Sequence, residues 1–137
     1  MNEKKSYIIG GIVGFAILMG LAVWFLSGVY EAEKLLSIPE TVTLAKITKD
    51  GDTIKVTDDK LTELRQEIID LEVREYGYGD ISKYEGIKIQ FYENDKETIW
   101  FRIIDEETIW DYSEALTKGN VIEYKTEVDL LELISKY

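Results

Sequence analysis

The sequence predicts an N-terminal transmembrane helix followed by an α+β domain, a two-layer sandwich with two helices on one face of a mainly antiparallel sheet. Residues 7–29 carry no charge, and a bilayer core requires about 20 apolar residues in a helix. The rest of the chain has the length of one domain. Its apolar residues alternate with a period of two in most segments and recur at helical spacing in two, which predicts the order ββα-βββ-βα.

The apolar segment 7–29 is expected to be an uncleaved, single-pass anchor in the cell membrane. Two lysines precede it and two glutamates follow it closely, so the positive-inside rule places residues 1–6 in the cytoplasm and the domain outside. A cleaved signal peptide is the alternative, because Gly20-Leu21-Ala22 offers a small-x-small cleavage site. Cleavage there would leave an apolar terminus, and the uncharged run is longer than a signal peptide requires.

Two glycines within this segment, Gly10 and Gly14, form a G-x-x-x-G pattern. Glycines at this spacing allow two membrane helices to approach closely, which permits a homodimer or a membrane-protein partner at the anchor. The alternative is that these glycines are incidental, because glycine is common in membrane helices.

Composition excludes several classes of function. The chain has a net charge of −11 and contains neither cysteine nor histidine. The acidic charge argues against binding nucleic acid or anionic headgroups. The missing residue types remove disulfides, cysteine-ligated zinc and the usual pairs of nucleophile and base. We expect no enzyme, no cofactor and no metal; a hydrolase that uses two carboxylates is the less favoured alternative.

Helix formers in residues 31–37 predict that the anchor continues as a helical linker over residues 30–40, until Pro39 stops it. The domain is then residues 41–137. Because the sequence has no long stalk of serine, glycine or proline, the domain is expected to start close to the membrane.

The first half of the domain is predicted to be a β-hairpin and a helix. Residues 41–48 and 53–57 flank Asp50-Gly51, a typical hairpin turn, and the spacing of a calcium-binding loop is absent. Thr57 is expected to cap the following helix. The apolar stripe of this helix consists of Leu61, Leu64, Ile68 and Leu71.

Residues 72–86 are predicted to be a loop, longer than most connections inside a domain. The segment contains three tyrosines, at positions 76, 78 and 84. These tyrosines either contribute to function or fold back over the sheet.

The next three strands are predicted at 87–92, 97–104 and 108–112. Aliphatic side chains stay together if residues 91 and 99, 89 and 101, and 103 and 109 pair, with a three-residue loop that contains Asn94 or Asp95 in a left-handed conformation. One face of these strands is then aliphatic. The opposite face is aromatic and polar, and it contains Gln90, Tyr92, Trp100, Arg102, Trp110 and Tyr112.

The C-terminal part is predicted as a turn or short helix over 113–120 closed by Gly119, a strand over 121–125, and a last helix. Thr126 is expected to cap that helix, with Asp129 three residues later in a capping-box arrangement. Its apolar side is expected to contain Val128, Leu130, Leu131 and Ile134.

This layout resembles small extracytoplasmic domains of unknown function that follow a single N-terminal anchor in Gram-positive bacteria. The resemblance covers residues 41–137. The residues that carry it are the hairpin KITKDGDTIKVTD, which leads into an amphipathic helix, and the strand VIEYK, which leads into a capped final helix. The resemblance implies no activity, and the Tyr/Gly segment and the two tryptophans depart from the pattern.

The aromatic and polar face is the candidate binding site, because tryptophan, tyrosine and arginine are enriched at binding hot spots. The alternative is that residues 72–86 or 113–120 cover this face as a minor core. We expect a membrane-tethered extracytoplasmic module that binds a membrane or cell-surface protein. An accessory or regulatory subunit recognised through its anchor is the alternative. The candidate binding residues are Tyr92, Trp100, Arg102, Trp110 and Tyr112.

Overall fold

A computed structural model of the chain describes residues 32–80 and 86–137. The predicted anchor over 7–29, including Gly10 and Gly14, lies outside the described residues. Within the described ranges, no helix has the length and apolar character needed to cross a membrane.

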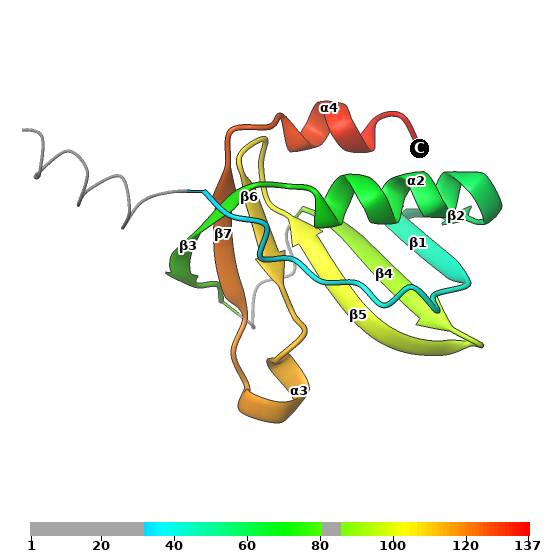
Figure 1. Cartoon of the computed structure of the whole chain (residues 1–137), viewed down its shortest axis with the longest axis horizontal. Helices are drawn as coiled ribbons and strands as arrows, with labels where there is room; N and C mark the ends of the chain where they lie inside the picture. Colours follow the sequence, from blue (N-terminus) through cyan, green and yellow to red (C-terminus); the bar gives the residue numbers. More distant parts are fainter. Residues whose placement is uncertain (1–31, 81–85) are drawn as a thin grey trace, which may run out of the picture. The chain divides into compact units, whose positions relative to one another are not determined.

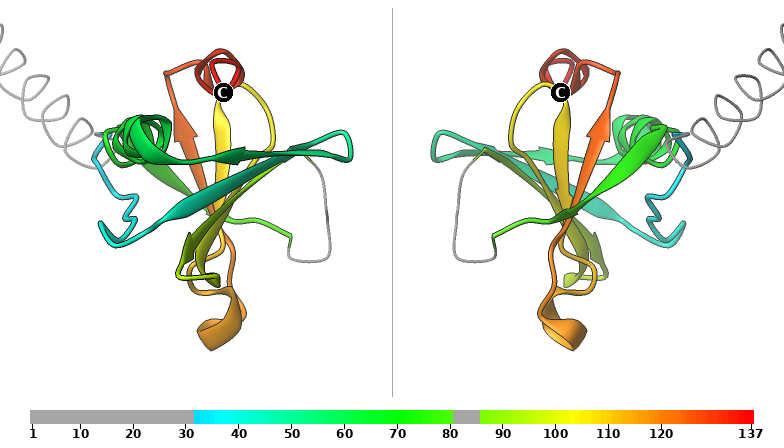
Figure 2. Two further views of the ribbon diagram at one scale, coloured as in Figure 1. Left: turned by 90° about the vertical axis from the view of Figure 1, so that its right-hand side faces the viewer. Right: turned by 90° about the vertical axis from the view of Figure 1, so that its left-hand side faces the viewer.

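The described residues form an α+β fold around one antiparallel sheet of seven strands, in the order β2-β1-β4-β5-β6-β7-β3 (Figure 1). The views in Figure 2 show that the sheet is strongly twisted and that helices α2 and α4 lie on the same side of it. The predicted fold class of this domain is therefore confirmed. The strands are β1 (Leu44–Lys49), β2 (Asp52–Val56), β3 (Val73–Tyr78), β4 (Ile87–Glu93), β5 (Lys96–Ile103), β6 (Thr108–Asp111) and β7 (Ile122–Thr126), and the helices are α2 (Asp58–Ile69), α3 (Ala115–Lys118) and α4 (Leu130–Ile134).

The first hairpin and helix form as predicted. Asp50 and Gly51 have φ values of 52° and 83°, which a two-residue hairpin turn with matching twist requires. Thr57 occupies the N-cap position of α2, although its side chain makes no capping hydrogen bond. The apolar stripe of α2 is buried against the sheet: Leu61, Leu64, Ile68 and, just beyond the helix, Leu71.

The register of the central meander is confirmed, but its first loop differs from the prediction. Phe91 pairs with Ile99, and Ile103 pairs with Ile109. The loop between β4 and β5 has two residues, Asn94 and Asp95, with φ values of 46° and 70°. A bulge beside Phe91 absorbs the extra residue. The predicted three-residue loop is thus replaced by a two-residue turn and one extra residue in a bulge of the neighbouring strand. The pairing beyond the bulge is the same as predicted, so the aliphatic side chains stay together.

The predicted loop over 72–86 is wrong in its first half, because this half forms strand β3. Val73 to Tyr78 pair with β7 at the edge of the sheet, with an irregularity between Glu75 and Gly77. Only Val73 of this strand is buried. An edge strand that is mostly exposed to solvent needs few alternating apolar residues. The sequence of residues 73–78 therefore lacks the period-two pattern that would have indicated a strand. Tyr76 and Tyr78 are exposed, and position 84 lies outside the described residues.

The described part of the predicted helical linker is not helical. Glu33 and Val73 exchange two backbone hydrogen bonds of 2.8 and 3.0 Å, which holds residues 32–34 beside β3. Leu36 and Ile38 are buried in the core, and the Arg65 guanidinium donates to the Ile38 carbonyl at 2.7 Å. Burial and backbone pairing outweigh the weak helix propensity of this segment.

The C-terminal helix begins three residues later than a Thr126 cap implies. Thr126 ends β7, and its hydroxyl donates to the Glu72 carbonyl at 3.0 Å. Asp129 is the N-cap instead, accepting hydrogen bonds from the backbone N–H groups of the next turn. This shift buries Leu133 and leaves Val128 and Leu131 exposed. The short helix α3, which ends at Gly119 in a left-handed conformation, forms where it was expected.

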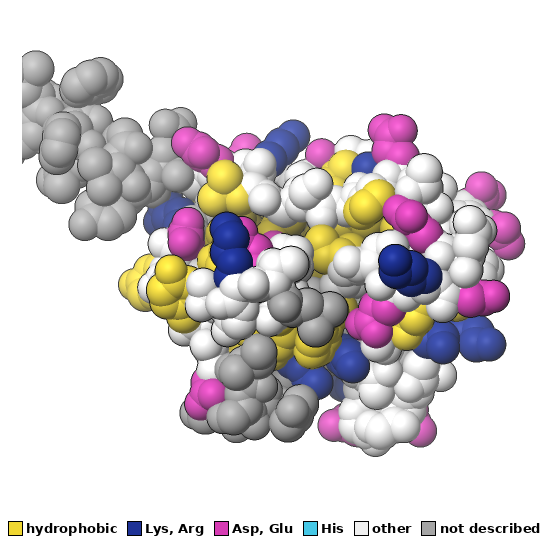
Figure 3. All heavy atoms as spheres, turned by 90° about the horizontal axis from the view of Figure 1, so that it is seen from below, with side chains coloured by type: hydrophobic (Ala, Val, Ile, Leu, Met, Phe, Trp, Pro, Cys, Tyr) yellow, Lys and Arg dark blue, Asp and Glu magenta, His cyan; other side chains and the backbone are white. Residues whose placement is uncertain are grey.

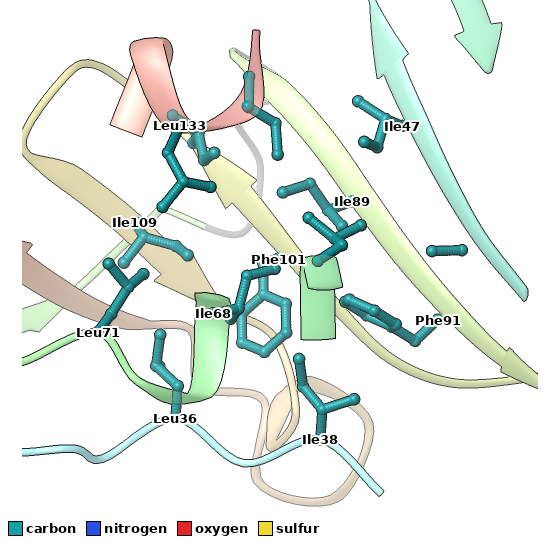
Figure 4. Packing of buried hydrophobic residues seen from close by; sticks show 14 of the residues in the cluster. Leu36, Ile38, Ile47, Ile68, Leu71, Ile89, Phe91, Phe101, Ile109 and Leu133 are labelled. Atoms are coloured by element: carbon teal, nitrogen blue, oxygen red, sulfur yellow. The ribbon is translucent and has the colours of Figure 1, made fainter. Parts of the chain in front are cut away.

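The main core lies between the aliphatic face of the sheet and helices α2 and α4. Figure 4 shows Phe101 close to Ile68 of α2, with Leu36 and Ile38 of the incoming segment near the same cluster. Phe91 and Phe101 are fully buried and meet edge to face, with ring centroids 6.3 Å apart. Because these side chains point into the core, the alternate side chains of the central strands point to the opposite face of the sheet.

Replacing Asp95 with glycine is expected to stabilise the fold by about 1 kcal/mol, because a left-handed conformation is unfavourable for a side chain at this position. The measurement is the free energy of unfolding in urea. Lys55→Gly is the control at a regularly paired strand position of β2 and should destabilise. Equal effects of the two substitutions would contradict the proposed turn geometry.

Candidate binding surface

The face of the sheet opposite α2 and α4, here called the outer face, contains all five predicted binding residues. Register places Lys88, Arg102 and Trp110 side by side on β4, β5 and β6. The neighbouring row contains Lys46, Gln90 and Trp100. The structure divides this face into a covered part and an open part.

The covered part is a minor core beneath the chain that follows β3. Trp110 and Tyr112 are 7% and 3% exposed and form a cluster with Val121. A Cβ on Gly79 would lie 2.7 Å from the Trp110 ring, so only glycine allows the backbone to approach this closely. The Trp110 indole N–H donates to the Glu123 carboxylate at 2.9 Å. These side chains therefore serve packing, in line with the alternative interpretation.

The open part is centred on Trp100, which is half-buried at the border of the minor core. Its ring stacks on Tyr112, with centroids 3.9 Å apart and planes 22° apart. The Lys88 ammonium lies 4.6 Å from the Trp100 centroid, and the Arg102 guanidinium carbon lies 5.7 Å from it. Both are within the range of a cation–π interaction. Trp100 is thus held rigidly from one side and flanked by cations.

A second contact of the same kind lies beside it. The Lys46 ammonium is 4.9 Å from the centroid of Tyr92. Burial, followed by the nearby Glu97 carboxylate, raises the pKa of the Tyr92 phenol, so this ring is neutral at physiological pH. Lys46, Lys88, Tyr92 and Trp100 together are here called the cation–aromatic strip.

The charge on this strip is opposite to that of the chain. Among the side chains that register places on the outer face of β2, β1, β4 and β5, the cations are Lys46, Lys55, Lys88 and Arg102 and the carboxylate is Glu97. Lys and Arg side chains lie next to exposed hydrophobic side chains on the side of the molecule seen in Figure 3. A basic, aromatic surface on a chain of net charge −11 is suited to an acidic ligand.

The structure therefore separates the five predicted residues into two roles. Trp100 and Tyr92 belong to the open strip, while Trp110 and Tyr112 belong to the minor core and the buried Arg102 lies between them. Sequence reasoning missed the two lysines of the strip. Extending the period-two pattern from Gln90 to Lys88 would have found one of them. Lys46 lies on β1, and no sequence signal indicated that β1 pairs with β4.

A buried carboxylate lies on the helix-covered face. Asp111 accepts the Ser113 backbone N–H at 2.8 Å. Burial raises the pKa of Asp111, and the nearby Glu114 adds to the effect, while the Ser113 hydrogen bonds oppose it. Burial, together with Asp111, Glu75 and Glu114, raises the pKa of Tyr124 to about 12. The described part of the chain contains no cluster of acidic side chains that could hold a metal ion.

No protein-family model, curated protein or solved structure matches this chain.

Trp110→Ala is expected to lower the free energy of unfolding by about 3–5 kcal/mol, as for a large buried aromatic side chain. Trp100→Ala should lower it by about 1–2 kcal/mol, because this ring is only partly buried at the border of the minor core. Urea unfolding followed by circular dichroism compares the two variants. A larger loss for Trp100 than for Trp110 would contradict the division of the face.

Asp111→Asn is expected to stabilise the protein at neutral pH, because it removes a buried charge and still accepts the Ser113 hydrogen bond. A raised pKa means that the folded state binds the Asp111 proton more tightly than the unfolded state does. The stability of the wild type therefore falls as pH rises from the ordinary value of 3.8 through the raised pKa.

The gain from Asp111→Asn should consequently grow with pH over this window and vanish below pH 3.8. The measurement is the difference in unfolding free energy between variant and wild type at several pH values. Glu40→Gln, at an exposed position outside the helices, controls for the loss of one negative charge. A gain that is independent of pH would count against the assignment.

Proposed function

We propose that this protein is a membrane-tethered extracytoplasmic binding module that contacts a protein partner through the cation–aromatic strip. The observation that carries the proposal is the partly buried Trp100, which is stacked on Tyr112 and flanked by the Lys88 and Arg102 cations. A preordered aromatic ring loses little conformational entropy on binding, which favours affinity.

The chemistry of the strip suits an acidic partner segment that also carries an apolar or aromatic side chain. The ring of Trp100 offers a flat apolar contact, and the Lys46 and Lys88 ammonium groups can pair with carboxylates. Because the chain as a whole is acidic, an acidic partner is attracted to this face and repelled by the acidic parts of the remaining surface. Such a charge pattern supports one orientation of binding.

The proposal gives the anchor the role of concentrating the module at the membrane. Residues 7–29 have the length and the lack of charge that a transmembrane helix needs. Restricting both partners to one membrane raises their effective concentration, so a surface of modest size can suffice.

The test is photo-crosslinking in cells with the full chain. A photoreactive amino acid at Gln90, which lies between Lys46 and Trp100 in the sheet, is expected to capture a defined partner. The same group at Thr62, an exposed position on α2, should not. Lys46→Glu with Lys88→Glu should abolish the crosslink, and Trp100→Ala should lower affinity about 30-fold, as hot-spot residues do.

Capture of the same partner from Gln90 and Thr62, or an undiminished crosslink in a charge-reversed variant that folds normally, would exclude the strip as the contact surface. Folding of each variant is checked by near-ultraviolet circular dichroism.

A further inference from the structure

The structure contains a second surface, at the β2 edge of the sheet, which reaches the helix-covered face and lies outside the cation–aromatic strip. Strand β2 is the last strand at one edge, and no described residue pairs with its outer side. Between β2 and α4 lies a cavity of about 450 Å³. We infer that this β2–α4 groove binds an extended peptide segment of a partner protein, which adds to β2 as a further strand.

The hairpin geometry shows which backbone groups of β2 are available. Lys49 and Asp52 flank the two-residue turn, and such a pair exchanges its hydrogen bonds, after which bonded and non-bonded pairs alternate. Thr53 and Lys55 are therefore in non-bonded pairs with β1. Their N–H and C=O groups point away from β1, outward at the edge of the sheet. An added strand could pair with these two donors and two acceptors.

Apolar side chains line the groove beside this edge, and the charged residues Lys49, Asp50 and Asp52 line it at the hairpin turn. Ile54 of β2 and Leu131 of α4 are 43% and 42% exposed, and both line the cavity. Exposed apolar residues that line the same groove are typical of binding sites. The remaining apolar lining residues are Ile47, Ile87, Ile134 and Tyr137.

A basic cavity of about 350 Å³ adjoins the groove and shares Ile54 and Tyr137 with it. Its cations are Lys55, Lys60 and Lys136. Lys60 and Lys136 pair with glutamates of α2 at 3.4 and 3.2 Å. Lys55 makes no ion pair with any residue that the structure describes. Its ammonium group is therefore the one of the three that can pair with a carboxylate of a ligand.

These features define the chemistry of the peptide. Alternate side chains of a strand added to β2 point either into the groove or toward the side of Lys55. The first set should be apolar and the second should include a carboxylate. A helix could not satisfy the open N–H and C=O groups, because its own are already paired. A second copy of β2, related by a two-fold axis at Ile54, would bring Thr53 and no carboxylate opposite Lys55.

The experiment uses the full chain in detergent micelles and a fluorescent peptide, acetyl-Glu-Val-Thr-Val-Thr-Val-Glu-amide. Its valines suit the groove, and its glutamates lie on the side of Lys55. Fluorescence anisotropy should show saturable binding below about 1 mM. The counterpart peptide with lysine in place of both glutamates should bind at least about tenfold more weakly, because it repels Lys55.

Two variants of the protein test the two halves of the site. Thr53→Pro removes an outward N–H, which an edge strand tolerates, and should weaken peptide binding at least about tenfold. Leu131→Asp on α4 places a charge in the groove without altering the hairpin, and it should have a similar effect. Trp100→Ala, in the cation–aromatic strip, should leave peptide binding unchanged, so failure here is distinct from failure of the proposed function.

Three results would overturn the inference. The first is no binding of the acidic peptide at about 1 mM. The second is undiminished binding to both folded variants. The third is self-association of the chain that competes with the peptide and is lost in Thr53→Pro, since a second copy would then be the occupant.

Discussion

The burial of Phe91 and Phe101 on one face of the central strands is the constraint on which the other features depend. Their edge-to-face contact, with centroids 6.3 Å apart, sets the register between β4 and β5. Because side chains alternate along a strand, a shift of one residue would exchange the core with the outer face. The same register therefore brings Trp100 and the lysines of the strip outward, and it fixes which residues can meet a partner.

Several parts of this arrangement follow from local signals. The Asp50-Gly51 turn, the stripe of α2 and the pairs of the meander are specified by turn chemistry and strong periodicity. The errors have a common physical cause, which is tertiary pairing. Residues 32–38 have helix formers but pair with β3 and fill the core, while β3 itself is an exposed edge strand that lacks an apolar pattern.

For the candidate site as well, local sequence predicts only what does not depend on tertiary pairing. Period-two alternation was sufficient to assign the aromatic residues to one face. It could not show that the chain around Gly79 covers Trp110 and leaves Trp100 open, because that depends on where a distant segment crosses the sheet. Lys88 follows the same alternation as Gln90 on β4, but Lys46 joins the strip only because β1 lies beside β4, which no local pattern indicates. Local pattern therefore defines a face, and topology decides which part of it is accessible.

The bridge between Glu33 and Val73 has a mechanical consequence. Tension applied to the chain ahead of Ala32 would reach the fold first at this pair of backbone hydrogen bonds. The next points of resistance along the chain are the buried side chains of Leu36 and Ile38 and the Arg65 hydrogen bonds to the Ile38 carbonyl. Force applied from the N-terminal side would thus first separate residues 32–34 from β3. It would then remove Leu36 and Ile38 from the core before it acted on strands β4, β5 and β6. The fold has its force-sensitive element at the point where the chain enters it.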